Sequence, residues 1–205
     1  MCQNDHFIDR AKDWDTKSHR VKNAESLAKA ILKHVKLTGG EHLMDFGAGT
    51  GLLSWFLADK ISKITAVDFS SAMLEQFKSK SWPCEIDILQ TGIEPDFNGL
   101  NVEGIISSMT LHHIEHTLKL FKKFFDVLKP GGFLAIGDLV TEDGSFHTDN
   151  SGVFHFGFEE QNLVELMKIS GFSEIKFSIV HEMEKGFEEG IKKYPIFLLT
   201  GIRMH

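Results

Sequence analysis

The chain has 205 residues, of which 42% are hydrophobic and 25% are charged, so it is long and apolar enough to bury the core of one globular domain. Its 22 lysine and arginine residues, against 29 acidic residues, give a formal charge of −7. No lysine- or arginine-dense run stands out, which argues against a nucleic-acid substrate, because phosphate binding normally requires a basic face.

The cysteines and the N-terminal residues bear on the cellular compartment. Cys2 and Cys84 lie far apart in the sequence, so reduced thiols fit better than a disulfide framework. The N-terminal residues lack the basic and then apolar pattern of a secretion signal, and no apolar run is long enough to span a membrane. We therefore expect a cytoplasmic protein without a membrane partner.

Two helices are predicted before the first strand. Phe7, Ala11 and Trp14 recur at helical spacing among charged residues and indicate a short amphipathic helix. A continuous apolar stripe from His19 to Lys36 indicates a second, structural helix, which Gly39 and its glycine neighbour would stop.

Strands and helices then alternate along the chain. The predicted strands are His42 to Phe46, Lys63 to Asp68, Glu85 to Leu89, Val102 to Ser107 and Phe133 to Asp138. The predicted helices are Leu52 to about Lys60, Ser70 or Ser71 to Lys80, and Ile114 to Leu128. Such an alternation predicts a parallel sheet covered on both faces, with ligands at the carboxyl ends of the strands.

The tail of the chain changes character. Three elements are predicted there: a helix from Glu159 to Ser170, and strands from Glu174 to Val180 and from Ile196 to Arg203. The gap between the two strands contains Gly186, Gly190 and Pro195 and lacks the helical pattern of a crossover. Without a crossover, these two strands are expected to pair antiparallel.

A glycine-rich loop follows the first predicted strand. It reads Asp45-Phe46-Gly47-Ala48-Gly49-Thr50-Gly51 and leads into a predicted helix. Glycines tolerate positive φ and let backbone amides approach a ligand, while the helix start offers unpaired N–H groups. An acid lies two positions before the first glycine, and Ser54 stands where a dinucleotide-binding loop has its third glycine. The loop thus favours the polar end of another cofactor.

Three motifs in this order resemble the class I S-adenosylmethionine-dependent methyltransferases, in particular the small single-domain (type 11-like) kind. They are the glycine loop, Val67-Asp68-Phe69 and Leu111-His112-His113-Ile114, and the resemblance spans about Glu41 to Gly171. It implies an α/β, Rossmann-like doubly wound sheet of seven strands in the order 3-2-1-4-5-7-6, with strand 7 antiparallel. It also implies one methyltransferase domain over residues 1–205, with N-terminal helices in 1–40, a sheet core in 41–205 and a cap segment at about 139–158.

The resemblance implies S-adenosylmethionine as cofactor and S-adenosylhomocysteine as product. The methionyl end would lie against the loop and the end of strand four, at Asp45, Gly47, Ala48, Gly49, Gly51, Ser107 and Ser108. Asp68 ends strand two about 20 residues after the first glycine, where a carboxylate can accept hydrogen bonds from both ribose hydroxyls. An N-cap for the next helix is the alternative role for Asp68.

The adenine position departs from the family pattern. Gly92, followed by Ile93, stands where the family usually has an acid. One possibility is that the backbone of Gly92 and Ile93 and a nearby side chain such as Gln90 contact the adenine. The alternative is that the cofactor binds more weakly than is usual in the family. Phe69 either covers an adenine face or belongs to the core.

Histidines are the candidate catalytic residues. His112 and His155 are potential general bases, which methyl transfer needs only when the acceptor must lose a proton. His155 lies in an aromatic-rich stretch from Asp138 to Phe158 that either walls a small acceptor or folds onto its own aromatics. His112, His113 and His116 invite a zinc interpretation, but no third ligand with matching spacing follows, so we expect no metal site.

The sequence therefore predicts an S-adenosylmethionine-dependent methyltransferase with a small-molecule acceptor. Two alternatives stay open: a nicotinamide-dependent oxidoreductase and a non-catalytic S-adenosylmethionine-binding regulatory protein. Ser54 and the acid before the loop count against the first, whereas Gly92 lends weight to the second. The acceptor atom, the oligomeric state and any lid role of the N-terminal helix are not readable from the residues.

Overall fold

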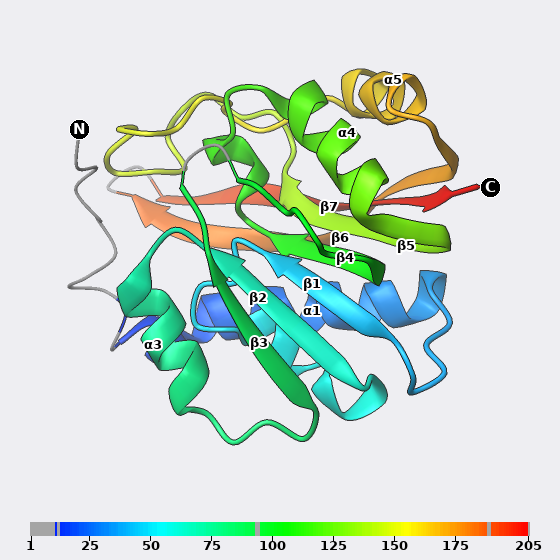
Figure 1. Ribbon diagram of the computed structural model, residues 1–205. Helices are drawn as coiled ribbons and strands as arrows, with labels where there is room; N and C mark the ends of the chain where they lie inside the picture. Colours follow the sequence, from blue (N-terminus) through cyan, green and yellow to red (C-terminus); the bar gives the residue numbers. More distant parts are fainter. Residues whose placement is uncertain (1–10, 12, 93–94, 188–189, 205) are drawn as a thin grey trace.

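The computed structural model describes residues 11, 13–92, 95–187 and 190–204, and these residues form a mixed sheet. Its strands are β1 (His42–Phe46), β2 (Lys63–Asp68), β3 (Glu85–Gln90), β4 (Val102–Ser108), β5 (Leu128–Leu139), β6 (Phe172–Phe187) and β7 (Gly190–Arg203). In the described residues they form one seven-stranded sheet in the order β3-β2-β1-β4-β5-β7-β6 (Figure 1). β7 runs antiparallel to both β5 and β6, and the other neighbours are parallel. The predicted fold class and strand order are confirmed.

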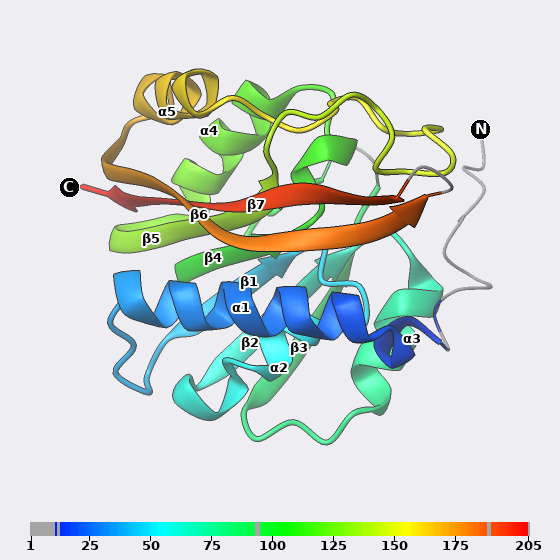
Figure 2. The same ribbon diagram turned by 180° about the vertical axis from the view of Figure 1, so that it is seen from behind.

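Helices cover both faces of this sheet. They are η1 (Trp14–Thr16), α1 (Ser18–His34), α2 (Leu52–Trp55), η2 (Ala58–Lys60), α3 (Ser71–Ser79), η3 (Leu111–His113), α4 (Thr117–Val127) and α5 (Glu160–Ile169). α4 and α5 lie on one face, and α1 lies on the other (Figures 1 and 2). None of the helices in the described part of the chain is long and apolar enough to cross a membrane.

Two apolar cores hold the helices to the sheet. One contains Phe121 and Phe124 of α4 with Met44 of β1, and the other contains Ile31 of α1 with Leu43 of β1. Neighbouring residues of β1 thus enter opposite cores, as the alternation of a strand requires. Because β1, β2, β4 and β5 are parallel, their carboxyl ends meet at one edge of the sheet, where such folds bind ligands.

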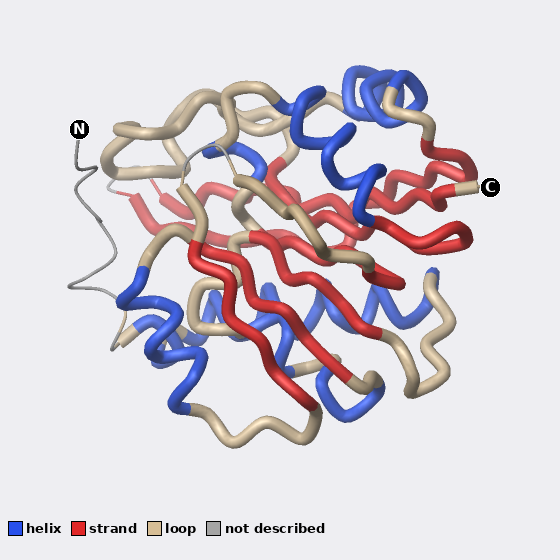
Figure 3. Tube along the Cα trace, viewed as in Figure 1, coloured by secondary structure: helices blue, strands red, loops and turns tan. Residues whose placement is uncertain are grey.

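The two C-terminal strands are longer than predicted. In the described part of the gap expected between them, residues 181–187 and 190–195 are strand. Met183 pairs with Tyr194 and Phe187 with Gly190, so β6 and β7 form one long hairpin. Pro195 has no N–H, but it lies past the end of β5, where β7 has a single neighbouring strand. Figure 3 shows this hairpin in red extending beyond its neighbours.

Some helix boundaries also differ from the predictions. The helix expected from Leu52 to Lys60 is split into α2 and η2, and the helix expected from Ile114 begins only at Thr117, after η3. The short helix predicted around Phe7 lies mostly outside the described residues. Trp14, the last residue of its predicted apolar stripe, is the first residue of η1.

Candidate active site

The glycine loop is a tight turn between β1 and α2. Gly47 and Ala48 donate backbone hydrogen bonds to the Val67 carbonyl, at 2.8 and 3.1 Å. Gly47 has φ of 67°, and a Cβ there would lie 2.2 Å from the Thr110 hydroxyl. Gly49 also has positive φ, 55°, but a Cβ there would meet no atom within 4 Å. The loop thus packs closely at Gly47 and faces open space at Gly49.

Asp68 connects the end of β2 to this loop. Its Oδ2 accepts a hydrogen bond from the Gly49 N–H at 2.7 Å, and its Oδ1 accepts one from the Ser70 N–H at 2.9 Å. The N-cap of α3 is Ser70, whose hydroxyl accepts from the Met73 N–H, so the alternative assignment of Asp68 as the N-cap is wrong. The carboxylate lies where the loop and the start of α3 meet.

Asp45 is a buried acid beneath the loop. The Ser54 hydroxyl donates to its Oδ2 at 2.6 Å, so the residue that replaces the third dinucleotide glycine is a partner of the acid before the loop. Burial raises the pKa of Asp45 to about 7, against the opposing hydrogen bond from Ser54. This carboxyl therefore changes its charge near neutral pH.

The end of β4 lies beside the loop. The buried hydroxyl of Ser107 donates to the Phe46 carbonyl at 2.7 Å, so its proton is not available to a ligand. After Ser108, Met109 has φ of 55°, a left-handed conformation that is uncommon for a residue with a side chain. Strain of this kind is concentrated at functional sites.

The predicted adenine side lies at the ends of β2 and β3. The Phe69 side chain is 40% exposed, so it is not a core residue. A Cβ added at Gly92 would meet no atom within 4 Å, and Gln90 donates from its side chain to the Phe69 carbonyl at 3.1 Å. Ile93 lies outside the described residues.

His112 is held by an acid that sequence reasoning missed. The Nδ1 of His112 contacts Oδ1 of Asp138 at 2.7 Å, and the His112 backbone N–H donates to Oδ2 at 3.1 Å. Burial alone would raise the pKa of Asp138, but the charge of His112 and hydrogen bonds from His112 and Leu139 bring it below its usual value. Asp138 was predicted only as the last residue of a strand, and the contact joins two distant segments.

Two further histidines gather at His112. Its ring centre lies 4.1 Å from that of His113 and 4.9 Å from that of His147, and one ligand atom of each residue lies within 4.8 Å of the others. Burial, and then the charges of His112 and His113, lower the pKa of His147 to about 4. His116, which the sequence grouped with His113 on a helix, is instead the exposed N-cap of α4 and lies outside this cluster.

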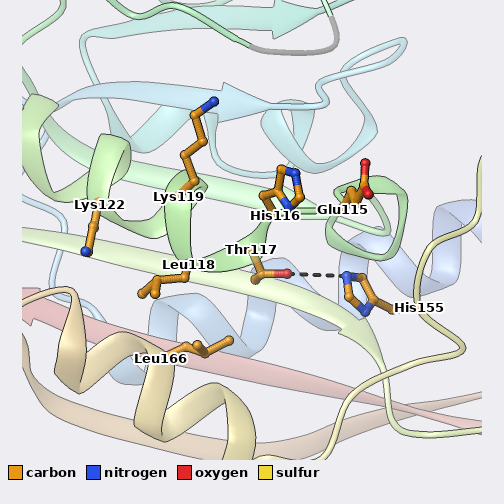
Figure 4. Close-up of a pocket in the computed structure, with 8 residues that line it drawn as sticks. All are labelled: Glu115, His116, Thr117, Leu118, Lys119, Lys122, His155 and Leu166. Atoms are coloured by element: carbon orange, nitrogen blue, oxygen red, sulfur yellow. Dashed lines mark hydrogen bonds between the residues drawn. The ribbon is translucent and has the colours of Figure 1, made fainter.

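The ring of His155 is not part of this cluster. Its Nε2 contacts the Ile114 carbonyl at 2.9 Å and the Thr117 hydroxyl at 3.4 Å. With Thr117, Lys119 and Lys122 of α4, it lines an open pocket of about 570 Å³ (Figure 4). The backbone N–H of His155 donates to the His112 carbonyl at 3.2 Å, but among the described residues no hydrogen bond joins the side chains of the two candidate bases.

The cap segment both packs on neighbouring elements and presents aromatic surface. Phe146 is buried against Tyr194, with ring centres 5.1 Å apart, in a small core that joins the segment to β7. Phe154 and Phe156 are exposed. The backbone N–H of Phe154 donates to the His112 carbonyl at 3.0 Å, so the segment is also joined to η3.

The N-terminal segment contacts the glycine loop directly. Oδ1 of Asp15 accepts a hydrogen bond from the Thr50 hydroxyl at 2.5 Å, and Oδ2 forms an ion pair with Lys80 at 2.6 Å. Lys80 in turn donates to the Thr50 carbonyl at 2.6 Å. These contacts place η1 beside the loop.

Comparison with known proteins finds similarity to methyltransferases. Residues 44–136 match the family described as "Methyltransferase domain". Among curated proteins, an uncharacterized methyltransferase of Schizosaccharomyces pombe is 30% identical over 154 residues, which cover 65% of this chain and 54% of the relative. The ubiquinone biosynthesis O-methyltransferase of Coxiella burnetii is 27% identical over 134 residues, or 62% of this chain and 57% of the relative. The chain thus spans little more than half the length of these relatives.

Solved structures share the fold. A chain from a Haloferax volcanii complex that contains the Trm112 methyltransferase activator has a TM-score of 0.81 at 15% identity, with 100% of both chains covered. The Haemonchus contortus phosphoethanolamine N-methyltransferase 2 in complex with S-adenosylmethionine has a TM-score of 0.70 at 17% identity, with 100% of this chain and 61% of that chain covered.

Proposed function

We propose that the chain is a class I S-adenosylmethionine-dependent methyltransferase and that it transfers a methyl group from S-adenosylmethionine to a small-molecule acceptor; the methyltransferase family match, the methyltransferase relatives and the shared fold support this. The observation that carries the proposal is the glycine loop. A Cβ at Gly49 would enter open space, and the Asp68 carboxylate lies directly beside that glycine. The backbone at Gly49 and the carboxylate of Asp68 are thus positioned for the polar parts of one ligand.

The residues present fit an adenosyl ligand. The loop from Gly47 to Gly51, with the backbone of Ser107 and Ser108, would hold the methionyl end, and Asp68 would accept from the ribose hydroxyls. The open position at Gly92 and the exposed ring of Phe69 would receive the adenine, without the acid that the family usually has there. Asp45 supports the loop from beneath through Ser54.

S-adenosylmethionine supplies an activated methyl group when bound. The chain's own contribution is orientation, which contributes up to about 7–11 kcal/mol when two reactants are held in line. The cap segment, about residues 139–158, would enclose the acceptor next to η3. His112, oriented by Asp138, is positioned to receive a proton at Nε2 from an acceptor that must lose one. His155 has its Nε2 on the Ile114 carbonyl and is less well placed for that role.

A small acceptor agrees with the charge and the cap segment. The chain carries a net charge of −7, which disfavours a polyanionic substrate. Exposed Phe154 and Phe156 in the cap segment give it apolar surface for a partly apolar molecule.

The proposal is tested by following a labelled methyl group. The purified chain is incubated with methyl-labelled S-adenosylmethionine and a cell extract, and the products are separated into small molecules, protein and RNA. We expect label in the small-molecule fraction, and much less of it with Asp68→Ala when the concentration of S-adenosylmethionine is below saturation. Label that enters protein or RNA instead would contradict the proposed acceptor class.

A further inference from the structure

The cluster of His112, His113 and His147 has features that neither the fold nor the proposed methyl transfer explains. One ligand atom from each residue lies within 4.8 Å of the other two. The Nε2 atoms of His112 and His147 are buried and have no hydrogen-bond partner among the described residues. Buried polar atoms are nearly always paired, because an unpaired one loses its hydration without compensation. Two such nitrogens in one cluster indicate a shared ligand.

In two of the three histidines, the Nδ1 atom already has a partner. The Nδ1 of His112 contacts the Asp138 carboxylate at 2.7 Å, and the Nδ1 of His113 contacts the Gly152 carbonyl at 2.7 Å. Metal-binding histidines typically donate their second ring nitrogen to a carboxylate or a backbone carbonyl, which orients the ring and fixes its tautomer. Both arrangements occur here, and each leaves Nε2 for a metal ion.

We propose that His112, His113 and His147 bind one divalent transition-metal ion of the zinc type. Three imidazole nitrogens suit zinc and its neighbours, whereas magnesium and calcium prefer oxygen ligands. His112 and His113 belong to η3, and His147 is supplied by the cap segment, so the ion would fasten that segment over the end of β4. This third ligand is distant in the sequence, which is why spacing alone predicts no site.

The ion would also lie near the reacting groups. Thr110, two residues before His112, contacts Gly47 of the glycine loop. Three protein ligands leave a fourth position, as in catalytic zinc sites, and that position would bind an oxygen, nitrogen or sulfur atom of the acceptor. This use of the site rests on the proposed function, whereas metal binding itself does not. With the ion bound, Nε2 of His112 is a ligand and no longer a proton acceptor, and the ion would instead lower the pKa of the acceptor group that it binds.

Metal binding is measured without cofactor or acceptor. Tag-free protein is treated with EDTA, dialysed, and titrated with Zn²⁺ by equilibrium dialysis and with Co²⁺ by visible absorption. We expect about one ion per chain for the unmodified protein and for the control His116→Ala, whose exposed histidine lies outside the cluster. His147→Ala and His113→Ala should weaken binding at least about tenfold, and Asp138→Asn about 10–100-fold.

A second measurement shows whether a variant that loses metal binding is still folded. It also tests adenosyl binding, and with it the proposed function, independently of the metal site. Each variant is also titrated with S-adenosylhomocysteine, which needs the fold but not the histidines. Loss of metal binding in His147→Ala with S-adenosylhomocysteine binding retained supports the site. The proposed metal site is overturned if the unmodified chain does not bind zinc, or if His147→Ala binds zinc equally well. This holds whether or not S-adenosylhomocysteine binds.

Discussion

The carboxylate of Asp68 accepts the backbone N–H of Gly49, with 2.7 Å between Oδ2 and the amide nitrogen, and so fixes the glycine loop to the end of β2. The same carboxylate would accept hydrogen bonds from the ribose hydroxyls, so its removal should weaken both the anchoring of the loop and the binding of the ligand. Loss of its charge-assisted hydrogen bonds should cost about 1.5–3 kcal/mol of S-adenosylmethionine binding in Asp68→Ala, or roughly 10–100-fold in affinity. Calorimetry checks this, with the exposed Asp59→Ala as the matched control. Unchanged affinity would rule out the ribose assignment.

Gly47 and Gly49 should respond differently to alanine. At Gly47 the new Cβ would collide with Thr110 and the residue would have to keep positive φ, so we expect a loss of at least about 2 kcal/mol in unfolding free energy. At Gly49 only the conformational cost of about 1–2 kcal/mol applies, because the Cβ enters open space. That space is the proposed ligand position, so Gly49→Ala should fold and lose S-adenosylmethionine binding. Urea unfolding and calorimetry separate the two effects, and full affinity in Gly49→Ala would place the ligand elsewhere.

Asp45 gives the protein a defined pH dependence. Its pKa is 3.8 ordinarily and about 7 in the fold, so between these values the folded state keeps a proton that the unfolded state releases. The unfolding free energy should therefore fall as pH rises through this window, by up to about 1.4 kcal/mol per pH unit, and level off above it. Asp45→Asn cannot titrate, so its stability relative to the unmodified chain should increase from pH 5 to pH 7. Parallel stability curves for the two proteins, measured by urea unfolding, would contradict the burial effect.

The contact between Asp15 and Thr50 should slow ligand release. Asp15→Ala removes the hydrogen bond to Thr50 and the ion pair with Lys80, both near the surface, so stability should change by less than about 1 kcal/mol. We expect S-adenosylhomocysteine to dissociate faster, because the N-terminal segment no longer holds the loop. Stopped-flow measurement compares it with Asp13→Ala, an exposed acid on the same segment. Equal rates for the two variants would show that η1 does not restrain the loop.

His155 should matter more for the cap segment than for the cofactor. Its ring joins that segment to the Ile114 carbonyl, so His155→Ala should lower the unfolding free energy by about 0.5–1.5 kcal/mol and leave S-adenosylmethionine affinity unchanged. Thermal unfolding and calorimetry test both parts. A large loss of affinity at unchanged stability would show that His155 reaches the cofactor.

The sequence predicts best the elements that local pattern determines. β1 and β2 have the predicted boundaries, because their apolar residues form runs bounded by a glycine loop or a capped helix. The hairpin extension is missed because Gly186, Gly190 and Pro195 disfavour strand locally, whereas pairing of buried Met183 with Tyr194 stabilises it.

The same distinction applies to the site. The glycine loop and Asp68 follow from contiguous motifs in the sequence. The contact of His112 with Asp138, and the approach of His147 to both neighbouring histidines, depend on folding of the cap segment over η3. No spacing in the sequence encodes those contacts.

The central claim is that the glycine loop binds an adenosyl cofactor of methyl transfer. Its most direct test is thermal unfolding of the purified chain with S-adenosylhomocysteine, S-adenosylmethionine or NAD, because a ligand that binds only the folded state raises its stability. Stabilisation by the two adenosyl ligands and not by NAD is the predicted result. Stabilisation by NAD alone would contradict the assignment of the loop and the methyltransferase function with it.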